Sequence, residues 1–391
     1  MIETKFKQTE LGPLPEDWDV TPISKCLSFG NGRDYKHLDS GIYPVYGTGG
    51  LITHINDFLY EGESVCIGRK GSIDKPQFHS GRFWTVDTLY YTHSFNDVIP
   101  KYVYYCFLCI NWRSLNEASG VPSLSQRIIG GQYIRVASSV YEQRKIAEAL
   151  SDIDALIREL DTLLEKKRFI MQAAMQDLLA ARRRLPGFDE PWEEMAFKDL
   201  GYTYNGLSGK TGLDFEHGDS KFIMFVNVIY KDTISPNYFE HVNVSKGEKQ
   251  NKVQKNDLIF NTSSETPDEV GMCSCVTEEY DDLYLNSFCF GLRFYKPNIN
   301  PRFLTFLLRS KIGRDLMMEL AQGSTRYNLP KRRFLTSKIR LPKDIHEQNE
   351  IASVLSDMND EIEEIEVKRD KYIAVRQGMM QQLLTGKIRL I

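Results

Sequence analysis

The sequence predicts an α+β fold in which two domains with mixed sheets alternate with two long helices, as a pseudo-two-fold internal repeat. Three observations predict this fold. A segment from the middle of the chain recurs at its end, both copies carry a heptad pattern, and each copy follows a stretch of short strand-like runs and glycine-rich turns. Together they indicate two domains separated by an antiparallel two-helix coiled coil.

The internal repeat begins at Glu142-Gln143 and again at Glu347-Gln348, 205 positions later. It continues without a gap to Leu185 in the first copy and to Leu390 in the second, and 17 of the 44 aligned pairs are identical. A unit of this length is too long for a solenoid repeat. The repeat therefore implies two similar halves and approximate two-fold symmetry within one chain.

Both copies of the repeat have apolar residues spaced alternately by four and three positions, which is the a/d pattern of a left-handed coiled coil. Each helix runs about 40 residues, or roughly 60 Å. The pair is antiparallel if the two-fold axis crosses it, whereas a parallel pair would place both preceding domains at one end. Polar residues interrupt the seam, either as long stems that reach solvent or as residues that fix the register. The first copy of the seam is Ile146, Leu150, Ile153, Ile157, Leu160, Leu164, Lys167, Met171, Ala174 and Leu178; the second is Ile351, Leu355, Met358, Ile362, Ile365, Arg369, Tyr372, Arg376, Met379 and Leu383.

The repeat divides the chain into four segments: a first domain (1–141), a first long helix (142–185), a second domain (186–346) and a second long helix (347–391). The first and last segments of the two domains are alike, whereas the sequences between them differ. We therefore expect these outer segments, the frame, to be duplicated and the segments between them, the middles, not to be duplicated. Unlike middles suit two domains that recognise different things. The expected strands include 42–46, 64–67, 85–92, 222–226, 257–260 and 284–295, and the expected helices are 100–116 and 301–320.

Composition indicates an ordinary globular protein, with 41% hydrophobic and 26% charged residues. No apolar run approaches a membrane span, and the polar start from Met1 to Gln8 lacks a signal-peptide core. We therefore expect a cytoplasmic location. A lone DNA-binding module is usually basic. The net charge of −4 argues against tight binding by this chain alone, or indicates that other subunits supply much of the phosphate contact. Cys106 and Cys109 form a CxxC in an apolar run, which indicates buried thiols and no metal site.

The sequence lacks motifs that carry chemistry. There is no GxxxxGK[ST] phosphate loop, and Gly47-Thr48-Gly49-Gly50 is too short for a dinucleotide fingerprint. The seven histidines are dispersed without HExxH spacing. We therefore predict no catalytic residues in this chain.

Three loops carry side chains suited to nucleic-acid recognition. Gly68–Ser72 is a short cationic loop, and Asn261–Pro267 gathers hydrogen-bonding groups that can read base edges. Gly323–Asn328, followed by Lys331–Arg333, places cations beside an aromatic residue, which suits backbone contact and stacking. Each loop has a plainer interpretation as a solvated or capped turn.

These features together resemble the specificity subunit of type I restriction–modification systems. The resemblance covers nearly the whole chain. It rests on the two Glu-Gln helices and on an ordered set of short blocks inside the duplicated frame. The first half departs from the pattern, because Val136–Ser139 lacks the proline that Pro342 supplies ahead of the second helix. The blocks are Tyr46–Gly50, Ile67–Ile73, Trp84–Tyr90, Ser264–Gly271, Tyr284–Phe290 and Gln322–Asn328.

The resemblance implies that each domain reads half of a bipartite, asymmetric sequence in double-stranded DNA, and that the helices set the gap between the half-sites. It also implies partners: two methyltransferase subunits that bind S-adenosylmethionine, and restriction/translocase subunits that use ATP and Mg²⁺. The chain itself would bind no cofactor and catalyse nothing. Alternatives are a specificity subunit for an orphan methyltransferase, a single-chain restriction–methylation enzyme, and a coiled-coil adaptor that binds no DNA. The expected DNA contacts are Lys36, Thr48, Arg69, Lys70 and Ser72 in the first domain, and Ser263, Ser264, Glu265, Thr266, Arg326, Tyr327 and Lys331 in the second.

Overall fold

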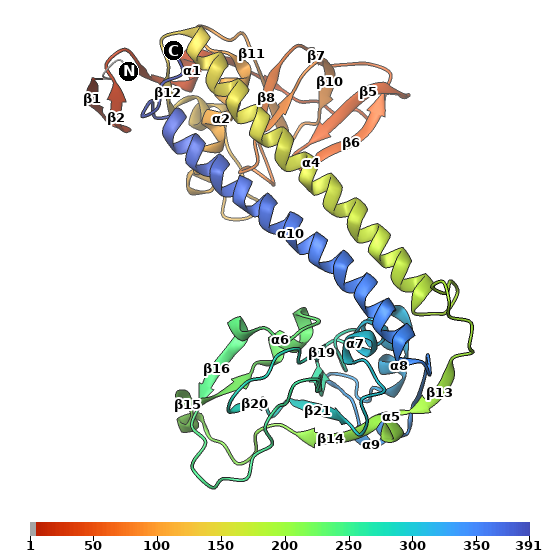
Figure 1. Ribbon diagram of the computed structural model, residues 1–391. Coiled ribbons are helices and arrows are strands. Elements are labelled where there is room, and N and C mark those ends of the chain that lie inside the picture. The colour runs from red at the N-terminus through yellow and green to blue at the C-terminus, as the bar shows by residue number, and fades with distance from the viewer. Residues whose placement is uncertain (1–4) are drawn as a thin grey trace. The chain divides into compact units, whose positions relative to one another are not determined.

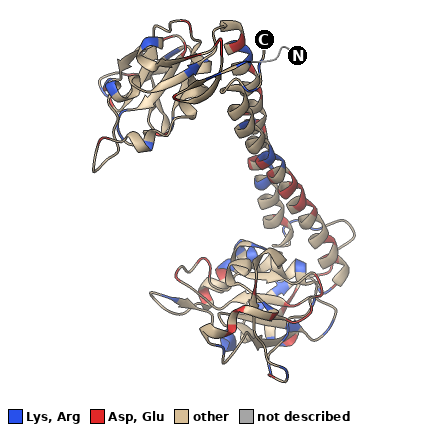
Figure 2. Cartoon of the chain, turned by 90° about the vertical axis from the view of Figure 1, so that its left-hand side faces the viewer, with Lys and Arg blue, Asp and Glu red and all other residues tan. Residues whose placement is uncertain are grey.

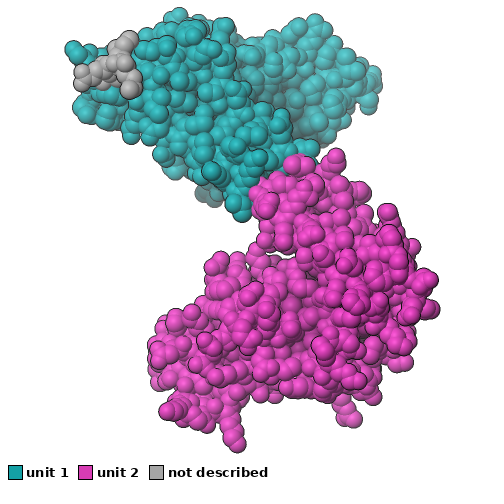
Figure 3. Space-filling view, viewed as in Figure 1, with its two compact units in different colours: residues 1–162, 366–391 teal, residues 163–365 magenta. Residues whose placement is uncertain are grey.

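The computed structural model describes residues 5–391, which form two units. Unit 1 comprises the chain up to Thr162 together with Glu366–Ile391, and unit 2 comprises Leu163–Ile365 (Figure 3). Each unit therefore contains the start of one long helix and the end of the other. Residues 1–4, part of the polar start on which the predicted cytoplasmic location rests, lie outside the described residues.

Unit 1 is a mixed-sheet domain that leads into the long helix α4 (Val140–Leu178) (Figure 1). Its strands are β1 (Phe6–Thr9), β2 (Gly12–Pro15), β3 (Asp19–Pro22), β4 (Ser28–Asn31), β5 (Ser40–Gly47), β6 (Gly50–Ile55), β7 (Tyr60–Glu61), β8 (Ser64–Gly68), β9 (Gln77–His79), β10 (Arg82–Thr85), β11 (Leu89–His93) and β12 (Tyr133–Val136). Its short helices are α1 (Ile23–Cys26), α2 (Pro100–Leu108), η1 (Trp112–Leu115) and α3 (Gln126–Gly130).

Unit 2 repeats this plan and leads into the long helix α10 (Ile345–Leu383). Its strands are β13 (Glu193–Ala196), β14 (Gly201–Asn205), β15 (Phe215–Ile223), β16 (Phe239–Val242), β17 (Leu258–Asn261), β18 (Ser263–Ser264), β19 (Cys273–Cys275), β20 (Leu283–Leu285), β21 (Cys289–Phe294), β22 (Tyr327–Asn328) and β23 (Lys338–Leu341). Its short helices are α5 (Phe197–Leu200), η2 (Gly212–Asp214), α6 (Phe225–Tyr230), η3 (Pro236–Tyr238), α7 (Pro301–Arg309), α8 (Lys311–Leu320) and α9 (Lys331–Thr336).

The strand order corresponds in the two units, except that β7 of unit 1 has no counterpart among the sheets of unit 2. Unit 1 has sheets ordered β6-β5-β10-β7 and β4-β11-β8-β9, and unit 2 has β16-β15-β20 and β14-β21-β17-β19. In both, one pair is parallel, β5 with β10 and β15 with β20, while the neighbouring pairs are antiparallel. We expected only the frame to be duplicated. That expectation is wrong for the topology, because the divergent middles follow the same path with different residues.

One cross-strand pair shows how the residues changed while the path stayed the same. In unit 1, Gly30 of β4 lies opposite Tyr91 of β11, and a Cβ added to the glycine would come within 2.1 Å of the tyrosine ring. In unit 2, Tyr204 of β14 lies opposite Gly291 of β21, again with 2.1 Å between an added Cβ and the ring. A tyrosine therefore fills the same space in each unit but comes from opposite strands of the pair, because directly opposed residues share a face of the sheet.

The long helices pack together as the predicted antiparallel coiled coil. In unit 1 the start of α4, through Ile146 and Leu150, shares a buried cluster with Leu383 at the end of α10. In unit 2 the end of α4, through Leu178, shares a cluster with Ile351 at the start of α10. Because starts meet ends in both units, the helices run in opposite directions. Charged residues of both signs occur along them (Figure 2).

The polar residues of the seam form ion pairs between the two helices. Lys167 contacts Glu361 at 2.5 Å in unit 2, and Arg376 contacts Asp154 at 2.6 Å in unit 1. Arg369 lies 3.7 Å from Asp161. Each pair joins α4 to α10, so these residues favour one register of the two helices. A long side chain that only extended into solvent would not fix the register.

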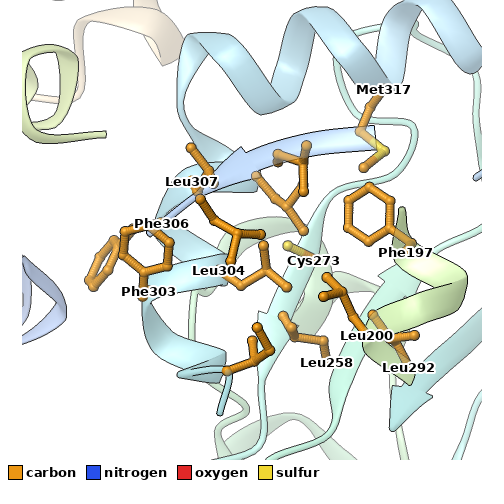
Figure 4. Packing of buried hydrophobic residues seen from close by; sticks show 14 of the residues in the cluster. Phe197, Leu200, Leu258, Cys273, Leu292, Phe303, Leu304, Phe306, Leu307 and Met317 are labelled. Carbon is orange, nitrogen blue, oxygen red and sulfur yellow. The ribbon is translucent and has the colours of Figure 1, made fainter. Parts of the chain in front are cut away.

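The core of unit 2 lies between the β14-β21-β17-β19 sheet and the helices α5, α7 and α8. Leu258 and Leu292 of the sheet belong to one buried cluster with Leu304 of α7 and Met317 of α8, and Figure 4 shows Met317 beside Phe197 of α5. Burial of such side chains contributes about 1.5–3 kcal/mol each. This packing supports the ends of β17 and β21, from which the candidate loops emerge.

Five expected elements differ in detail. The expected strands 85–92 and 284–295 are each interrupted by a turn, between β10 and β11 and between β20 and β21, and the expected helix 100–116 is divided into α2 and η1. Residues 222–226 are a strand only as far as Ile223, and α6 follows because Val228 and Ile229 point into the core while Phe225 and Tyr230 are exposed. Residues 301–320 form two helices, α7 and α8, separated at Ser310. None of the helices among the described residues has the length and apolarity that crossing a membrane requires.

The exchanged glycine–tyrosine pair gives a test of the duplicated topology. Gly30→Tyr alone should lower the free energy of unfolding by about 1–3 kcal/mol, because two rings would compete for one space. The double variant Gly30→Tyr/Tyr91→Gly recreates the arrangement of unit 2 and should recover most of that loss. Urea unfolding of the three proteins measures both effects. A double variant as unstable as the sum of its single variants would contradict the shared topology.

Candidate nucleic-acid interface

The cationic loop of unit 1 emerges from the end of β8 and is fixed through its backbone. Arg69 N–H donates to the carbonyl of Thr88 at 2.8 Å, and Leu124 N–H donates to the carbonyl of Arg69 at 3.0 Å. Lys70 forms a β-bridge with Ser123, in the loop 118–123 that contains Gly120 and is called the glycine loop of unit 1. The backbone is thus held on both sides, by the β10–β11 turn and by the glycine loop. The Arg69 and Lys70 side chains stay exposed.

Thr48 lies beside this loop. Gly71 has a φ of +90°, and a Cβ added there would lie 3.5 Å from Thr48 Oγ1. Ser72 is half-buried at the end of the loop. Lys36 is exposed in the β4–β5 connection, where Trp84 Nε1–H donates to the carbonyl of Arg33 at 2.8 Å.

Gln77 and His79 hold the turn that carries Thr48. The Gln77 amide donates to the carbonyls of Gly47 at 2.8 Å and Thr48 at 3.2 Å, and its oxygen lies 3.0 Å from His79 Nε2. The His79 ring stacks on Tyr46 with 3.6 Å between centroids. Burial lowers the pKa of His79 from 6.5 to about 4, so the ring is neutral near pH 7. Neither residue was predicted, because no spacing in the sequence links 77 to 47.

Unit 2 joins two of the predicted loops in the same way. Ser263 and Ser264 form β18, which pairs with Asn328 and Tyr327 of β22. Thr262 N–H donates to the carbonyl of Phe288 at 2.9 Å, as Arg69 does to Thr88 in unit 1. The loop after β17 therefore lies between the β20–β21 turn and the glycine loop 321–328, in the place that the cationic loop occupies in unit 1.

Within this loop, some predicted residues support it and others face solvent. Ser264 is mostly buried, and its hydroxyl donates to Glu269 Oε2 at 2.7 Å and accepts from Thr266 N–H at 3.3 Å. The Asn261 amide donates to the carbonyl of Glu269 at 3.3 Å. Glu265 and Thr266 have exposed side chains at the tip. Glu269, absent from the predicted set, is the residue that closes the loop.

The cations of the glycine loop differ in freedom. Arg326 is exposed, and its guanidinium lies 5.6 Å from the centre of the Phe288 ring. Lys331 is partly buried, lies over the Phe290 ring and donates to the Asn205 side chain. Burial lowers the pKa of Lys331. In unit 1, Gln126 at the start of α3 donates to Asn31 in the corresponding place. Lys331 thus has a structural partner as well as a position beside the loop.

In each unit the arrangement presents a short polar or cationic loop at the end of one buried strand, with a fixed backbone and exposed side chains at its tip. Such a surface suits contacts with phosphates and with base edges. The described residues contain no group of three or more His, Cys, Asp or Glu placed to hold a metal ion.

The sequence model of the type I restriction modification DNA specificity domain matches residues 15–166 and 189–371. The chain belongs to this family. Its role is therefore the recognition of DNA, and the resemblance seen in the sequence is confirmed. The family's domain occurs twice, once in each half of the internal repeat.

Similar proteins agree with this assignment. The MjaVIII type I restriction enzyme specificity subunit of Methanocaldococcus jannaschii is 22% identical, over 99% of this chain and 97% of its own length. The S subunit of a type I restriction–modification system from M. genitalium has the same fold, with a TM-score of 0.68 and 14% identity over 98% of this chain and 99% of that one. A chain solved in a study of type I complex assembly gives a TM-score of 0.53 with 12% identity, over 96% of this chain and 99% of that one.

The half-buried His79 predicts a pH dependence of stability in unit 1. The unfolded chain binds a proton at this residue near pH 6.5, whereas the folded unit binds it only near pH 4. Stability should therefore fall as the pH drops from 6.5 to 4, by roughly 1.4 kcal/mol for each pH unit, and be unaffected by this group above 6.5. Urea unfolding across this range measures the slope.

The His79→Phe variant keeps the stacked ring and should lose this part of the slope. His54→Phe, at an exposed histidine of the same unit, is the matched control and should keep it. Equal slopes for His79→Phe and the unmodified protein would contradict the assignment.

Proposed function

We propose that this chain is a specificity subunit that recognises a bipartite, asymmetric DNA sequence, with one half-site read by each unit. One observation carries the proposal: the same three-part arrangement of turn, loop and glycine loop occurs in both units with different side chains. Because the backbone arrangement is the same, both units would sit on DNA in the same way. Because the exposed side chains differ, the two units would contact different bases. The target should therefore not be palindromic.

The proposal gives the long helices the task of setting the gap between the half-sites. Each has 39 residues, which at 1.5 Å per residue is close to 60 Å. Two domains that meet the same face of DNA require half-sites about one helical turn apart. The interhelical ion pairs support this role, because a change of register would change the gap.

The proposal assigns the chemistry to partners. Methyltransferase subunits, one for each frame, would bind S-adenosylmethionine and flip the target adenine. Restriction/translocase subunits would use ATP and Mg²⁺. The chain itself would bind no cofactor and catalyse no step. The net charge of −4 supports this division, since a complex whose other subunits contact phosphates does not need a basic specificity chain.

Co-expression with a candidate methyltransferase subunit, followed by single-molecule sequencing of host DNA, tests the proposal. We expect modified adenine in one asymmetric motif with a fixed gap between two short half-sites. A complex that forms but modifies a palindromic or ungapped motif would overturn the two-reader scheme. Failure to form any complex would overturn the partner assignment.

The exposed Glu265 should read a base in the second half-site. Glu265→Ala should weaken discrimination at one base position by about 1–3 kcal/mol, because a carboxylate can accept from a cytosine amino group. Methylation rates on duplexes that vary each position of the half-site measure the effect. Glu279→Ala, another exposed acid of unit 2, serves as the control. Unchanged discrimination at every position would refute the role of Glu265.

The exposed Arg69 should contact DNA electrostatically. Arg69→Ala should weaken binding similarly for all sequences and reduce the slope of log K against log salt by about 1. Titration of the complex with duplex DNA at several salt concentrations gives the slope. Lys338→Ala removes an exposed cation of β23 that is paired with Glu194 of β13, and it should leave the slope unchanged. A slope that Arg69→Ala does not change would remove Arg69 from the interface.

A further inference from the structure

Phe288 is an exposed aromatic residue at the centre of the candidate interface of unit 2. Half of its surface, 51%, is accessible to solvent, although the chain places it beside a well-packed core. Its neighbours along the turn, Leu285 and Cys289, are buried. Exposed apolar residues are common singly, so the position of this one, beside the loop that carries Glu265, gives it significance.

The turn that carries Phe288 is held by hydrogen bonds of its backbone. Phe288 N–H donates to Asn286 Oδ1 at 2.9 Å, and the Phe288 carbonyl accepts from Thr262 N–H at 2.9 Å. Cys289 N–H donates to the carbonyl of Asn286 at 3.0 Å. Gly206 packs against the same carbonyl, since an added Cβ would come within 2.1 Å of it. Both backbone groups of Phe288 are therefore engaged, and the ring projects beside the recognition loop.

Arg326 covers one face of the ring. Its guanidinium carbon lies 5.6 Å from the ring centre, in the geometry of a cation–π contact. A ring with one face covered is poorly suited to insertion between two base pairs, which requires both faces. Its edge and its second face remain free for a contact in the major groove. The apolar group that the major groove offers there is the C5 methyl of thymine.

Unit 1 has a threonine at the corresponding position. The carbonyl of Thr88 accepts from Arg69 N–H at 2.8 Å, and Leu89 N–H donates to the carbonyl of Val86 at 2.9 Å, as in the turn of Phe288. The backbone frame is shared, whereas the side chain that it presents is not. The difference between phenylalanine and threonine at one fixed place is what two unlike half-sites would require.

We propose that Phe288, held under Arg326, reads the C5 methyl group of a thymine in the half-site bound by unit 2. The inference rests on the proposed function and adds to it a named residue and a named chemical group. The sequence placed Phe288 in the block Tyr284–Phe290 but did not show that, within this block, the Phe288 side chain is exposed.

Deoxyuridine provides the test, since uracil differs from thymine only by the C5 methyl group. The complex with the methyltransferase subunit is titrated with its target duplex and with duplexes in which each thymine of both half-sites is replaced singly by uracil. At one position we expect about fourfold weaker binding, the factor that one buried methylene-sized group contributes. Phe288→Ala should bind the thymine and uracil duplexes equally at that position.

Two further variants separate this role from a structural one. Phe288→Leu keeps an apolar group and should retain part of the discrimination. Tyr295→Ala, which removes an exposed aromatic residue that packs on Tyr202, should retain all of it. The inference is overturned if no thymine shows discrimination that Phe288→Ala removes, or if the half-sites lack a thymine at which to measure it. Loss of specific binding by the unmodified complex would instead refute the proposed function.

Discussion

A buried glutamate at the start of each long helix is the interaction on which the rest of both units depends. Glu142 accepts from Trp18 Nε1–H at 3.1 Å and from Arg389 at 2.6 and 2.9 Å. Glu347 accepts from Trp192 Nε1–H at 3.3 Å and from Arg184 at 2.6 and 2.8 Å. Both carboxylates are almost fully buried. We call each glutamate with its tryptophan and arginine partners a cage. A buried charge without its partner is strongly destabilising, so the three residues of a cage stabilise the fold only when all of them are in place.

Each cage joins three parts of the chain that are far apart in sequence. The glutamate begins one long helix, the tryptophan begins the domain, and the arginine follows the end of the other long helix. The adjacent Gln143 adds to the junction by accepting from Ile99 N–H at 3.0 Å and donating to the carbonyl of Ala137 at 2.9 Å. Gln348 does the same with Asn300 at 2.8 Å and Pro342 at 2.9 Å. The Glu-Gln pair therefore recurs because its two side chains join the domain, the start of one long helix and the segment that follows the other long helix.

Much of this architecture could be predicted from the sequence, because its signals are local or repeated. The Glu-Gln repeat located the helix starts, and the heptad pattern identified the seam that α4 and α10 bury. The shared topology of the middles could not be predicted, since a contact such as Gly30–Tyr91 survives in unit 2 with its residues exchanged. The cages were also invisible, because Arg389 and Glu142 are 247 positions apart.

The candidate interface shows the same limit. The sequence identified loops rich in polar and cationic residues, and the structure brings Ser263 and Tyr327 together in one strand pair. It could not separate Ser264, which supports its loop through Glu269, from Glu265, which faces solvent. Nor could it find Gln77 or Phe288, whose positions are set by hydrogen bonds to residues distant in the chain.

The measurement that tests the central role of the cages most directly is a double-mutant cycle on Glu347 and Arg184. The free energy of unfolding of unit 2 is measured for Glu347→Gln, Arg184→Gln and the double variant, with Lys338 and Glu194 of the same unit as the exposed reference pair. The account predicts a coupling energy of about 2–3 kcal/mol for the buried pair, well above that of the reference pair. Additive effects for Glu347 and Arg184 would contradict it.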